Sequence, residues 1–260
     1  MPQASREVNL TQSVLKALDV LECLASAEQP LSAQEVAQRC FLSRPTAYRH
    51  LITLLTRDYV TNCEDDRYYQ IGPKVLELGK SFLDRLDLLE LAKASMRELS
   101  RMSQETIHLT VLDGTEILYV AKVDGPQSVR MYSAIGTRNP LYCTAMGKAI
   151  LAFLPPEKRT ALLDQTTLAP RTANTITDRT ALDQHLELVR SQGFAIDDVE
   201  FEEGIRCLGA PIFNHTGRVT AAISISGPAY RLSNSRLQEL SGEVVETSEA
   251  ISVKLGYLPA

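Results

Sequence analysis

The sequence predicts an α+β fold with two domains, and three observations lead to this prediction. The chain has 260 residues, a length at which proteins commonly divide into two domains. Residues 8–71 carry short helical patterns that end in a hairpin pattern, whereas residues 87–260 alternate helical and strand patterns. Between them, Gly72 and Pro73 end the hairpin, and the apolar residues that follow predict a linker helix over residues 72–86.

The composition narrows the classes of protein to which the chain can belong. Hydrophobic residues make up 44% of the sequence, enough for folded cores, but no apolar run approaches the roughly 20 residues of a membrane-spanning helix. The N-terminus lacks the apolar segment of a secretory signal, and the five scattered cysteines contain no C-x-x-C pair, which is typical of reduced thiols in a cytoplasm. We see neither metal-ligand spacing nor a glycine-rich phosphate loop, so we expect no metal and no cofactor.

The first domain is predicted to begin with a helix over residues 10–25 and to continue with a pair of short helices. Apolar residues recur along the first helix at helical spacing, at Val14, Leu15, Leu18, Leu21 and Leu24. Ser32 and Glu35 have the spacing of a capping box, which starts a short helix ending near Arg39. Residues 40–42 form the turn, Ser43 caps the next helix, and Pro45 fits its first turn, where a missing N–H costs nothing.

The second helix of the pair carries the chemistry of a DNA-recognition helix. One stripe is apolar and consists of Ala47, Leu51, Leu54 and Leu55. Arginine, threonine and tyrosine lie on or beside the outer face, and arginine forks onto guanine edges or phosphates. A hairpin over residues 59–71, with its turn at 62–66, follows as a wing. We therefore predict a winged helix-turn-helix that contacts DNA through Ser32, Ser43, Arg44, Thr46, Ala47, Tyr48, Arg49 and His50.

The charge pattern supports this prediction locally. The whole chain is mildly acidic, with a net charge of −5, yet residues 36–57 contain four arginines and no Asp or Glu. A small basic face on an acidic protein is typical of a sequence-specific DNA reader with few phosphate contacts. The alternative is an ordinary pair of solvated helices.

The second domain is predicted to mix helices and strands in a sensor-like α+β arrangement. Turn signals support several of its elements, because Asp113-Gly114 favours a hairpin turn, while Pro155-Pro156 and Gly193 end helices. The predicted helices are 88–103, 144–154, a short one reaching about 163, 178–192 and 233–255. The predicted strands are 106–112, 116–122, 129–134, 209–214 and 219–226.

Three segments of this domain carry polar groups where a core would be apolar. Residues 140–148 enter a helix, and the free N–H groups at a helix start bind anions. Residues 197–209 combine acidic residues with Cys207, and Ser224 and Ser226 share one face of a strand, about 7 Å apart. These segments predict a site for a small polar ligand. The alternatives are a solvent-facing strand for the serines and a buried, inert thiol for Cys207.

Taken together, these residues resemble the IclR family of bacterial transcriptional regulators, from about Leu10 to Tyr257. The N-terminal part matches through SRPTAYRHLITLLTRDYV, and the C-terminal part through residues 140–148, 203–207, 210–211 and 223–228. The segments MRELSRMSQETIHL and VRMYSAIGTRNPLYCTAMGK resemble the subgroup of repressors that answers 2-keto-3-deoxygluconate. The resemblance implies a C-terminal α/β effector-binding domain of GAF-like fold. It also implies a homodimer or dimer of dimers that represses genes of carbohydrate or sugar-acid catabolism.

The resemblance also implies which residues hold the effector. Two backbone N–H groups, those of Ala145 and Met146, take the carboxylate, and the contacting side chains are Asp197, Cys207, Ser224 and Ser226. Hydroxyls and N–H groups satisfy carboxylate and carbonyl oxygens. Sensors of the smallest acids often have a smaller residue where this chain has Met146. By the same resemblance, the pocket is expected to be bordered by Tyr132, Asn139 and Tyr142.

Two other functions compete with this interpretation. In one, Cys207 is the nucleophile of an enzyme, with Asp197 and a histidine, but nothing in the pattern aims His215, eight residues away, at the thiol. In the other, a DNA-binding module is controlled only by a protein partner. We assign no catalytic residue and no metal ligand, and we expect double-stranded operator DNA and a small organic acid as partners, in the cytoplasm and away from membranes.

Overall fold

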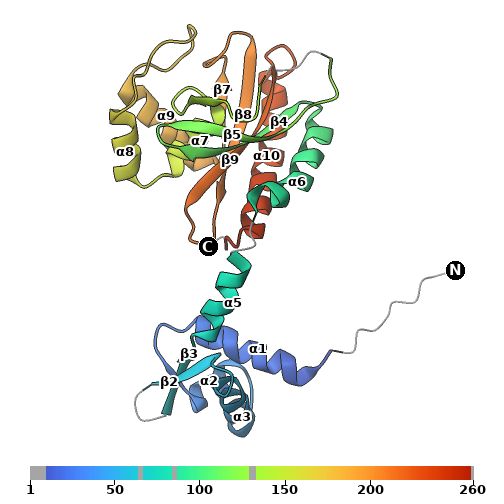
Figure 1. Ribbon diagram of the computed structural model, residues 1–260, viewed down its shortest axis with the longest axis vertical. Coiled ribbons are helices and arrows are strands. Elements are labelled where there is room, and N and C mark those ends of the chain that lie inside the picture. Colours follow the sequence, from blue (N-terminus) through green and yellow to red (C-terminus); the bar gives the residue numbers. More distant parts are fainter. Residues whose placement is uncertain (1–9, 64–66, 84–86, 129–132, 259–260) are drawn as a thin grey trace, which may run out of the picture. The chain divides into compact units, whose positions relative to one another are not determined.

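The computed structural model describes residues 10–63, 67–83, 87–128 and 133–258. Contacts divide the chain into two compact units, Met1–Leu86 and Asp87–Ala260, and Figure 1 labels most of their elements. None of the helices within the described ranges has the length and hydropathy that crossing a membrane requires. Within the same ranges, His, Cys, Asp and Glu side chains nowhere gather into a group that could hold a metal ion.

The N-terminal unit packs helices against a small antiparallel sheet with strand order β1-β3-β2. Its elements are α1 (Gln12–Ala25), β1 (Leu31–Ser32), α2 (Ala33–Arg39), α3 (Arg44–Leu55), β2 (Val60–Cys63), β3 (Tyr68–Ile71) and α5 (Lys74–Leu83). Val20, Val36, Leu51 and Val60 form part of one core. The predicted turn of the wing at 62–66 lies partly outside the described residues. Strand β1 was not predicted, because its two residues are too few to show a strand pattern in the sequence.

The caps of the helix-turn-helix form largely as expected. Ser32 and Glu35 make both hydrogen bonds of the capping box. Ser43 occupies the N-cap of α3, but its hydroxyl lies 2.8 Å from the Thr46 hydroxyl and bonds it instead of a backbone N–H. The Leu42 amide closes the turn by donating to the Ala37 carbonyl at 2.8 Å.

The predicted apolar stripe of α1 is buried only at its C-terminal end. Leu24 is buried in the core, whereas Val14, Leu15 and Leu18 are exposed. Val14 and Leu18 line an open groove, because the core of this unit packs against the other half of the helix, around Val20 and Leu24.

The C-terminal unit is a six-stranded antiparallel sheet with helices on both faces (Figure 1). The strand order is β6-β5-β4-β9-β8-β7. The strands are β4 (Thr106–Asp113), β5 (Glu116–Val123), β6 (Arg138–Pro140), β7 (Ala195–Asp198), β8 (Ile205–Phe213) and β9 (Val219–Pro228). The helices are α6 (Leu88–Ser103), α7 (Ala145–Phe153), α8 (Pro156–Asp164), α9 (Arg179–Gln192) and α10 (Asn234–Lys254). Helices α6 and α10 cover one face, and α7 covers the other with α9 behind it.

One strand prediction needs correction, and two edge strands of this sheet were not predicted. The predicted strand 129–134 falls mostly outside the described residues, and Ser133 and Ala134 do not lie in a strand. The sheet edge is instead β6, whose three residues are too few to show alternation. On the opposite edge, β7 was not predicted, because its sequence AIDD ends in two acidic residues.

Candidate DNA-binding surface and effector site

The N-terminal half of α3 presents polar side chains to solvent. Ser43, Arg44, Tyr48 and Arg49 are exposed, and Thr46 is half-buried. Arginine and tyrosine near the start of an exposed helix can reach base edges and phosphates in a major groove. This surface is the candidate DNA-contacting face.

One member of the predicted DNA-contacting set is wrong. Ala47 has no exposed surface and packs in the core of the N-terminal unit, one helical turn before Leu51. It belongs to the apolar stripe, so its side chain is not available to DNA. Ser32 and His50 are half-buried: the Ser32 hydroxyl donates to Glu35 at 2.7 Å, and His50 lines the groove beside α1.

The wing extends this face with residues that the sequence argument did not single out. A hollow of about 590 Å³ lies between the starts of α2 and α3 and strand β3. Its lining includes Gln34, Arg44, Tyr48, Arg67 and Tyr68. Arg67 adds a second guanidinium to the one on Arg44. Its position within the predicted hairpin could have indicated that it lies near the DNA-contacting face.

A separate groove of about 830 Å³ runs between α1, α3 and α5 within the same unit. Its lining is mainly apolar and includes Val14, Leu18, Leu21, Val75 and Leu78. Leu18 and Leu78 expose about half of their surface, 48% and 51%. Apolar surface gathered in this way is typical of a protein–protein contact.

In the C-terminal unit, backbone register gathers the predicted effector side chains on one face of the sheet. Directly paired residues of neighbouring strands point to the same face, as do residues two apart on one strand. Asp197 on β7 pairs with Cys207 on β8, and Cys207 pairs with Ser226 on β9. Ser224 is two residues from Ser226. We call these four side chains, Asp197, Cys207, Ser224 and Ser226, the polar row.

The start of α7 lies directly over the polar row. A side chain at Gly209, which pairs with Ser224, would come within 2.9 Å of the Ala145 carbonyl carbon and 3.0 Å of the Met146 amide nitrogen. Only a glycine allows this approach of helix and strand. The N–H groups of Ala145 and Met146 have no acceptor within their own helix, because they belong to its first turn. The fold therefore brings all six predicted effector residues together.

The serines belong to a chain of buried hydrogen bonds that includes a residue missed by the sequence argument. The Ser224 and Ser226 hydroxyls are 3.2 Å apart, and Nδ1 of His108 lies 3.2 Å from the Ser226 hydroxyl. Burial lowers the pKa of His108 to about 3, so the ring is neutral. Thr106 of β4 pairs with Ser226 of β9, and its buried hydroxyl has no hydrogen-bond partner among the described residues. A buried hydroxyl left without a partner is a position where a polar ligand gains a hydrogen bond.

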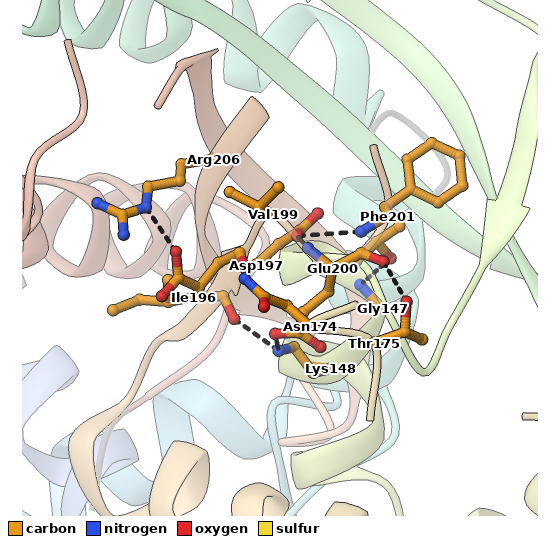
Figure 2. A network of polar contacts seen from close by, with 12 residues as sticks. Gly147, Lys148, Asn174, Thr175, Ile196, Asp197, Val199, Glu200, Phe201 and Arg206 are labelled. Carbon is orange, nitrogen blue, oxygen red and sulfur yellow. Dashed lines mark hydrogen bonds and ion pairs between the residues drawn. The ribbon is translucent and has the colours of Figure 1, made fainter. Parts of the chain in front are cut away.

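The loop after β7 holds Asp197 in place, as Figure 2 shows. Asp197 Oδ1 accepts hydrogen bonds from the Glu200 amide at 2.7 Å and the Phe201 amide at 3.3 Å. The Glu200 carboxylate pairs with the ammonium of Lys148, which also donates to the Ile196 carbonyl at 2.6 Å. Because Lys148 lies in α7, this buried ion pair links the start of the helix to the loop that holds Asp197.

Burial also sets the protonation of the two carboxyl groups. It raises the pKa of Asp197 to about 7, even though the Glu200 amide and the Lys148 charge act in the opposite direction. Burial raises the pKa of Glu200 as well, against the lowering effect of Lys148. Near neutral pH a substantial fraction of Asp197 is therefore protonated, and in that state the carboxyl can donate a hydrogen bond as well as accept one.

Cys207 lacks the features of a nucleophile. Burial raises the pKa of its thiol, and the nearby Asp197 raises it further. Among the hydrogen bonds of the described residues, the histidine closest to the row, His108, is engaged with Ser226 and Ser133 and not with the thiol. This environment keeps the sulfur in its unreactive, protonated form.

The three residues expected to border the pocket have different outcomes. Tyr132 lies outside the described residues. The Tyr142 hydroxyl donates to the Ala169 carbonyl at 2.6 Å, which directs it to the loop after α8. The Asn139 amide donates to the Tyr119 hydroxyl at 3.3 Å, on the same sheet face as the polar row.

Comparison with known proteins assigns both units to one family. Residues 13–62 match the IclR helix-turn-helix domain, and residues 80–253 match the bacterial transcriptional regulator IclR C-terminal domain. The chain is 40% identical over 252 residues to the HTH-type transcriptional regulator KdgR of Escherichia coli strain K12, covering 97% of this chain and 95% of that protein. It is 38% identical to KdgR of Dickeya chrysanthemi over the same share of this chain and 82% of the relative.

Solved structures share the fold as well as the sequence. The crystal structure of the Agobacterium tumefaciens repressor BlcR matches with a TM-score of 0.83 at 28% identity, covering 97% of this chain and 100% of that chain. The C-terminal domain of E. coli KdgR matches with a TM-score of 0.60 at 41% identity, covering 66% of this chain and 100% of that chain. The chain therefore belongs to the IclR family of bacterial transcriptional regulators, DNA-binding proteins with an N-terminal helix-turn-helix domain and a C-terminal α/β domain.

Proposed function

We propose that the protein represses genes of carbohydrate or sugar-acid catabolism in the cytoplasm, and that a small keto or sugar acid such as 2-keto-3-deoxygluconate controls its binding to operator DNA. The proposal that a small acid binds in the C-terminal unit is supported by one observation, which is that the polar row lies beside the first turn of α7. In this proposal the amides of Ala145 and Met146 take the carboxylate. Ser224, Ser226 and the protonated Asp197 then contact the carbonyl and hydroxyl oxygens.

The experiment that tests this proposal measures operator binding by the full chain with and without 2-keto-3-deoxygluconate. A change in operator affinity at saturating acid, with the acid recovered unchanged after incubation, supports a regulator that binds its effector without converting it. The coupling between the two sites is expected to be about 1–3 kcal/mol, or roughly 5- to 150-fold in affinity. Turnover of the acid would instead favour the enzyme hypothesis built on Cys207.

We expect Arg44→Ala and Arg49→Ala to weaken operator binding without unfolding the protein. Both side chains are exposed on α3, so the core is untouched. An arginine that reads a base edge should cost about 1–3 kcal/mol and relax specificity at one position, whereas a phosphate contact should weaken all sequences alike. Electrophoretic mobility shifts at several salt concentrations measure both effects. The matched control is Arg218→Ala in an exposed turn of the C-terminal unit, and unchanged binding by both α3 variants would show that another surface reads DNA.

We further propose that two copies of the chain pair through the groove between α1, α3 and α5, as a homodimer or as half of a dimer of dimers. A single recognition helix reads few base pairs, so symmetric half-sites need two copies. The groove and the exposed leucines beside it supply apolar surface for this contact.

Sedimentation velocity of the full chain at micromolar concentration should therefore give a dimer or tetramer. Leu18→Asp should shift the protein toward monomer, because it places a charge in the groove. The matched control is Leu188→Asp on α9, whose side chain is about as exposed as that of Leu18 but lies outside the groove, and it should leave assembly unchanged. A wild-type monomer that still binds operator tightly would contradict the proposed pairing.

A further inference from the structure

Val199, in the loop that follows β7, has a left-handed backbone with a φ of 58°. For a residue branched at Cβ this conformation is an outlier, because Cβ comes too close to the following carbonyl oxygen. Such a conformation persists only where the surrounding structure holds it, and it is often found at functional sites. The contacts around Val199 therefore indicate what the loop does.

Three side chains of the segment between α8 and α9 donate hydrogen bonds to three consecutive carbonyl groups of this loop. The bonds run from Asn174 Nδ2 to the Asp198 carbonyl at 2.9 Å, from the Thr172 hydroxyl to the Val199 carbonyl at 2.6 Å, and from the Thr175 hydroxyl to the Glu200 carbonyl at 2.7 Å. Figure 2 shows Asn174 and Thr175 beside the loop. We call Thr172, Asn174 and Thr175 the clamp.

The clamp is organised by its own backbone. The hydroxyl oxygen of Thr175, a buried residue, accepts hydrogen bonds from the Arg171 amide at 3.0 Å and the Thr172 amide at 2.9 Å. The Thr172 hydroxyl oxygen accepts a bond from the Asn174 amide at 3.1 Å. A further contact joins this segment to the loop, since the Arg171 guanidinium lies 5.2 Å from the centre of the Phe201 ring. The clamp is therefore an ordered turn and not a set of independent side chains.

The clamp orients the amide groups that bind Asp197, because a peptide group is planar. The Val199 carbonyl and the Glu200 amide belong to one peptide group, so a bond to the carbonyl also fixes the direction of the amide. The Glu200 carbonyl and the Phe201 amide form the next peptide group in the same way. These two amides donate to Asp197 Oδ1, at 2.7 Å and 3.3 Å. Each peptide group therefore binds the clamp at one end and Asp197, a member of the polar row, at the other.

The ion pair between Lys148 and Glu200 does not do the same work as the clamp. It holds the Glu200 side chain, which rotates about its own bonds and leaves the peptide planes free. An extended backbone at Val199 would send the following peptide groups in another direction and would take both donors away from Asp197. The left-handed turn thus depends on contacts to the backbone, and the clamp supplies them.

We propose that the clamp positions the effector site. It holds Val199 in the left-handed conformation, so that the two peptide groups that follow present their amides to Asp197. The inference rests on the proposed function, since it takes Asp197 to contact the effector. Thr172, Asn174 and Thr175 are then positioning residues, which act on effector binding through Asp197.

Thr172→Val tests the proposal, because it removes one hydrogen bond of the clamp and keeps the size of the side chain. Hydrogen–deuterium exchange of the full chain, measured on peptides that span residues 197–204, should become about 3- to 10-fold faster, the range of one hydrogen bond. Isothermal titration calorimetry should show 2-keto-3-deoxygluconate binding more weakly by a similar factor. The matched control is Thr177→Val, at an exposed threonine of the same segment outside the clamp, and it should change neither measurement. Unchanged exchange in peptides of β8 and β9 confirms that the variants are folded.

A second substitution, Val199→Gly, distinguishes positioning from a general weakening of the fold. Glycine adopts the left-handed conformation without strain, so the loop no longer depends on the clamp. Val199→Gly alone should bind the acid like wild type, and adding it to Thr172→Val should restore slow exchange and most of the affinity. A clamp that contributed only stability would lower the thermal midpoint and leave the affinity of the folded protein unchanged.

The outcomes separate this inference from the proposed function. Unchanged exchange in Thr172→Val, or faster exchange that Val199→Gly does not slow, overturns the inference. Faster exchange with unchanged affinity for the acid also overturns it, because the clamp would then shape the loop without positioning the effector site. If 2-keto-3-deoxygluconate does not bind wild-type protein at millimolar concentration, the proposed function fails. The exchange measurements need no ligand, and they still decide whether the clamp holds the donors to Asp197.

Discussion

Replacing Lys148 with Met should destabilise the C-terminal unit by about 3–5 kcal/mol. Lys148 and Glu200 are both buried, with side chains 0% and 6% exposed. Removing the ammonium leaves the Glu200 carboxylate without its ion-pair partner in the interior, where its Oε2 already has no hydrogen-bond partner among the described residues. Chemical denaturation at pH 7, followed by circular dichroism, measures the loss.

A pH series distinguishes a lost charge partner from a simple packing defect. Burial raises the pKa of Glu200, and removing Lys148 removes an effect that lowers it, so the folded variant should hold the Glu200 proton to still higher pH. A group whose folded pKa is raised costs no stability below its unfolded value, near 4.5, and its cost grows as the pH rises toward the folded pKa. The deficit of Lys148→Met should therefore shrink as the pH falls toward 4.5.

The double variant Lys148→Met with Glu200→Gln is the matched control. It removes both charges, so it should recover much of the lost stability at pH 7, since the uncompensated charge is gone. A deficit that is independent of pH and unchanged in the double variant would mean that Lys148 acts through packing alone.

Local signals explain which parts of the fold could be predicted from the sequence. Helix ends are set by caps that are readable in one dimension, such as the capping box at Ser32 and the left-handed Gly193 that ends α9. The hairpin of β4 and β5 follows from the Asp113-Gly114 turn in the same way. The short edge strands β1, β6 and β7 carry no such signal, and they were missed.

The site was only partly predictable, because its shape depends on pairing between distant strands. Ser224 and Ser226 show their shared face by spacing alone. The place of Tyr119 depends on a register shift between Leu109 and Thr110 of β4, which no sequence pattern marks. His108 resembles any strand residue until β4 is placed beside β9. The prediction that Ala47 contacts DNA was wrong for the opposite reason, since its position on the apolar stripe already indicated that it would be buried in the core.

Ser224→Ala together with Ser226→Ala should abolish the response to the effector and leave operator binding by the free protein unchanged. Both hydroxyls are buried and lie within hydrogen-bond distance of each other, and the Ser226 hydroxyl also bonds His108. Alanine keeps the size of the core nearly constant but removes the groups that would meet the carbonyl and hydroxyl oxygens of the acid. An acid can shift operator affinity only by binding one arrangement of the protein better than another, so loss of these contacts removes the difference.

The measurement is operator affinity as a function of acid concentration for the double variant and for a matched control. Ser235→Ala with Ser241→Ala, on α10, also removes two hydroxyls, one exposed and one half-buried, but both outside the polar row, and this control should respond like wild type. The thermal midpoint of the double variant should fall, because Nδ1 of the buried His108 loses its Ser226 partner. Addition of 2-keto-3-deoxygluconate should no longer raise that midpoint, whereas it should raise the midpoint of the control. A double variant that still changes its operator affinity at the wild-type acid concentration would show that the effector binds outside the polar row.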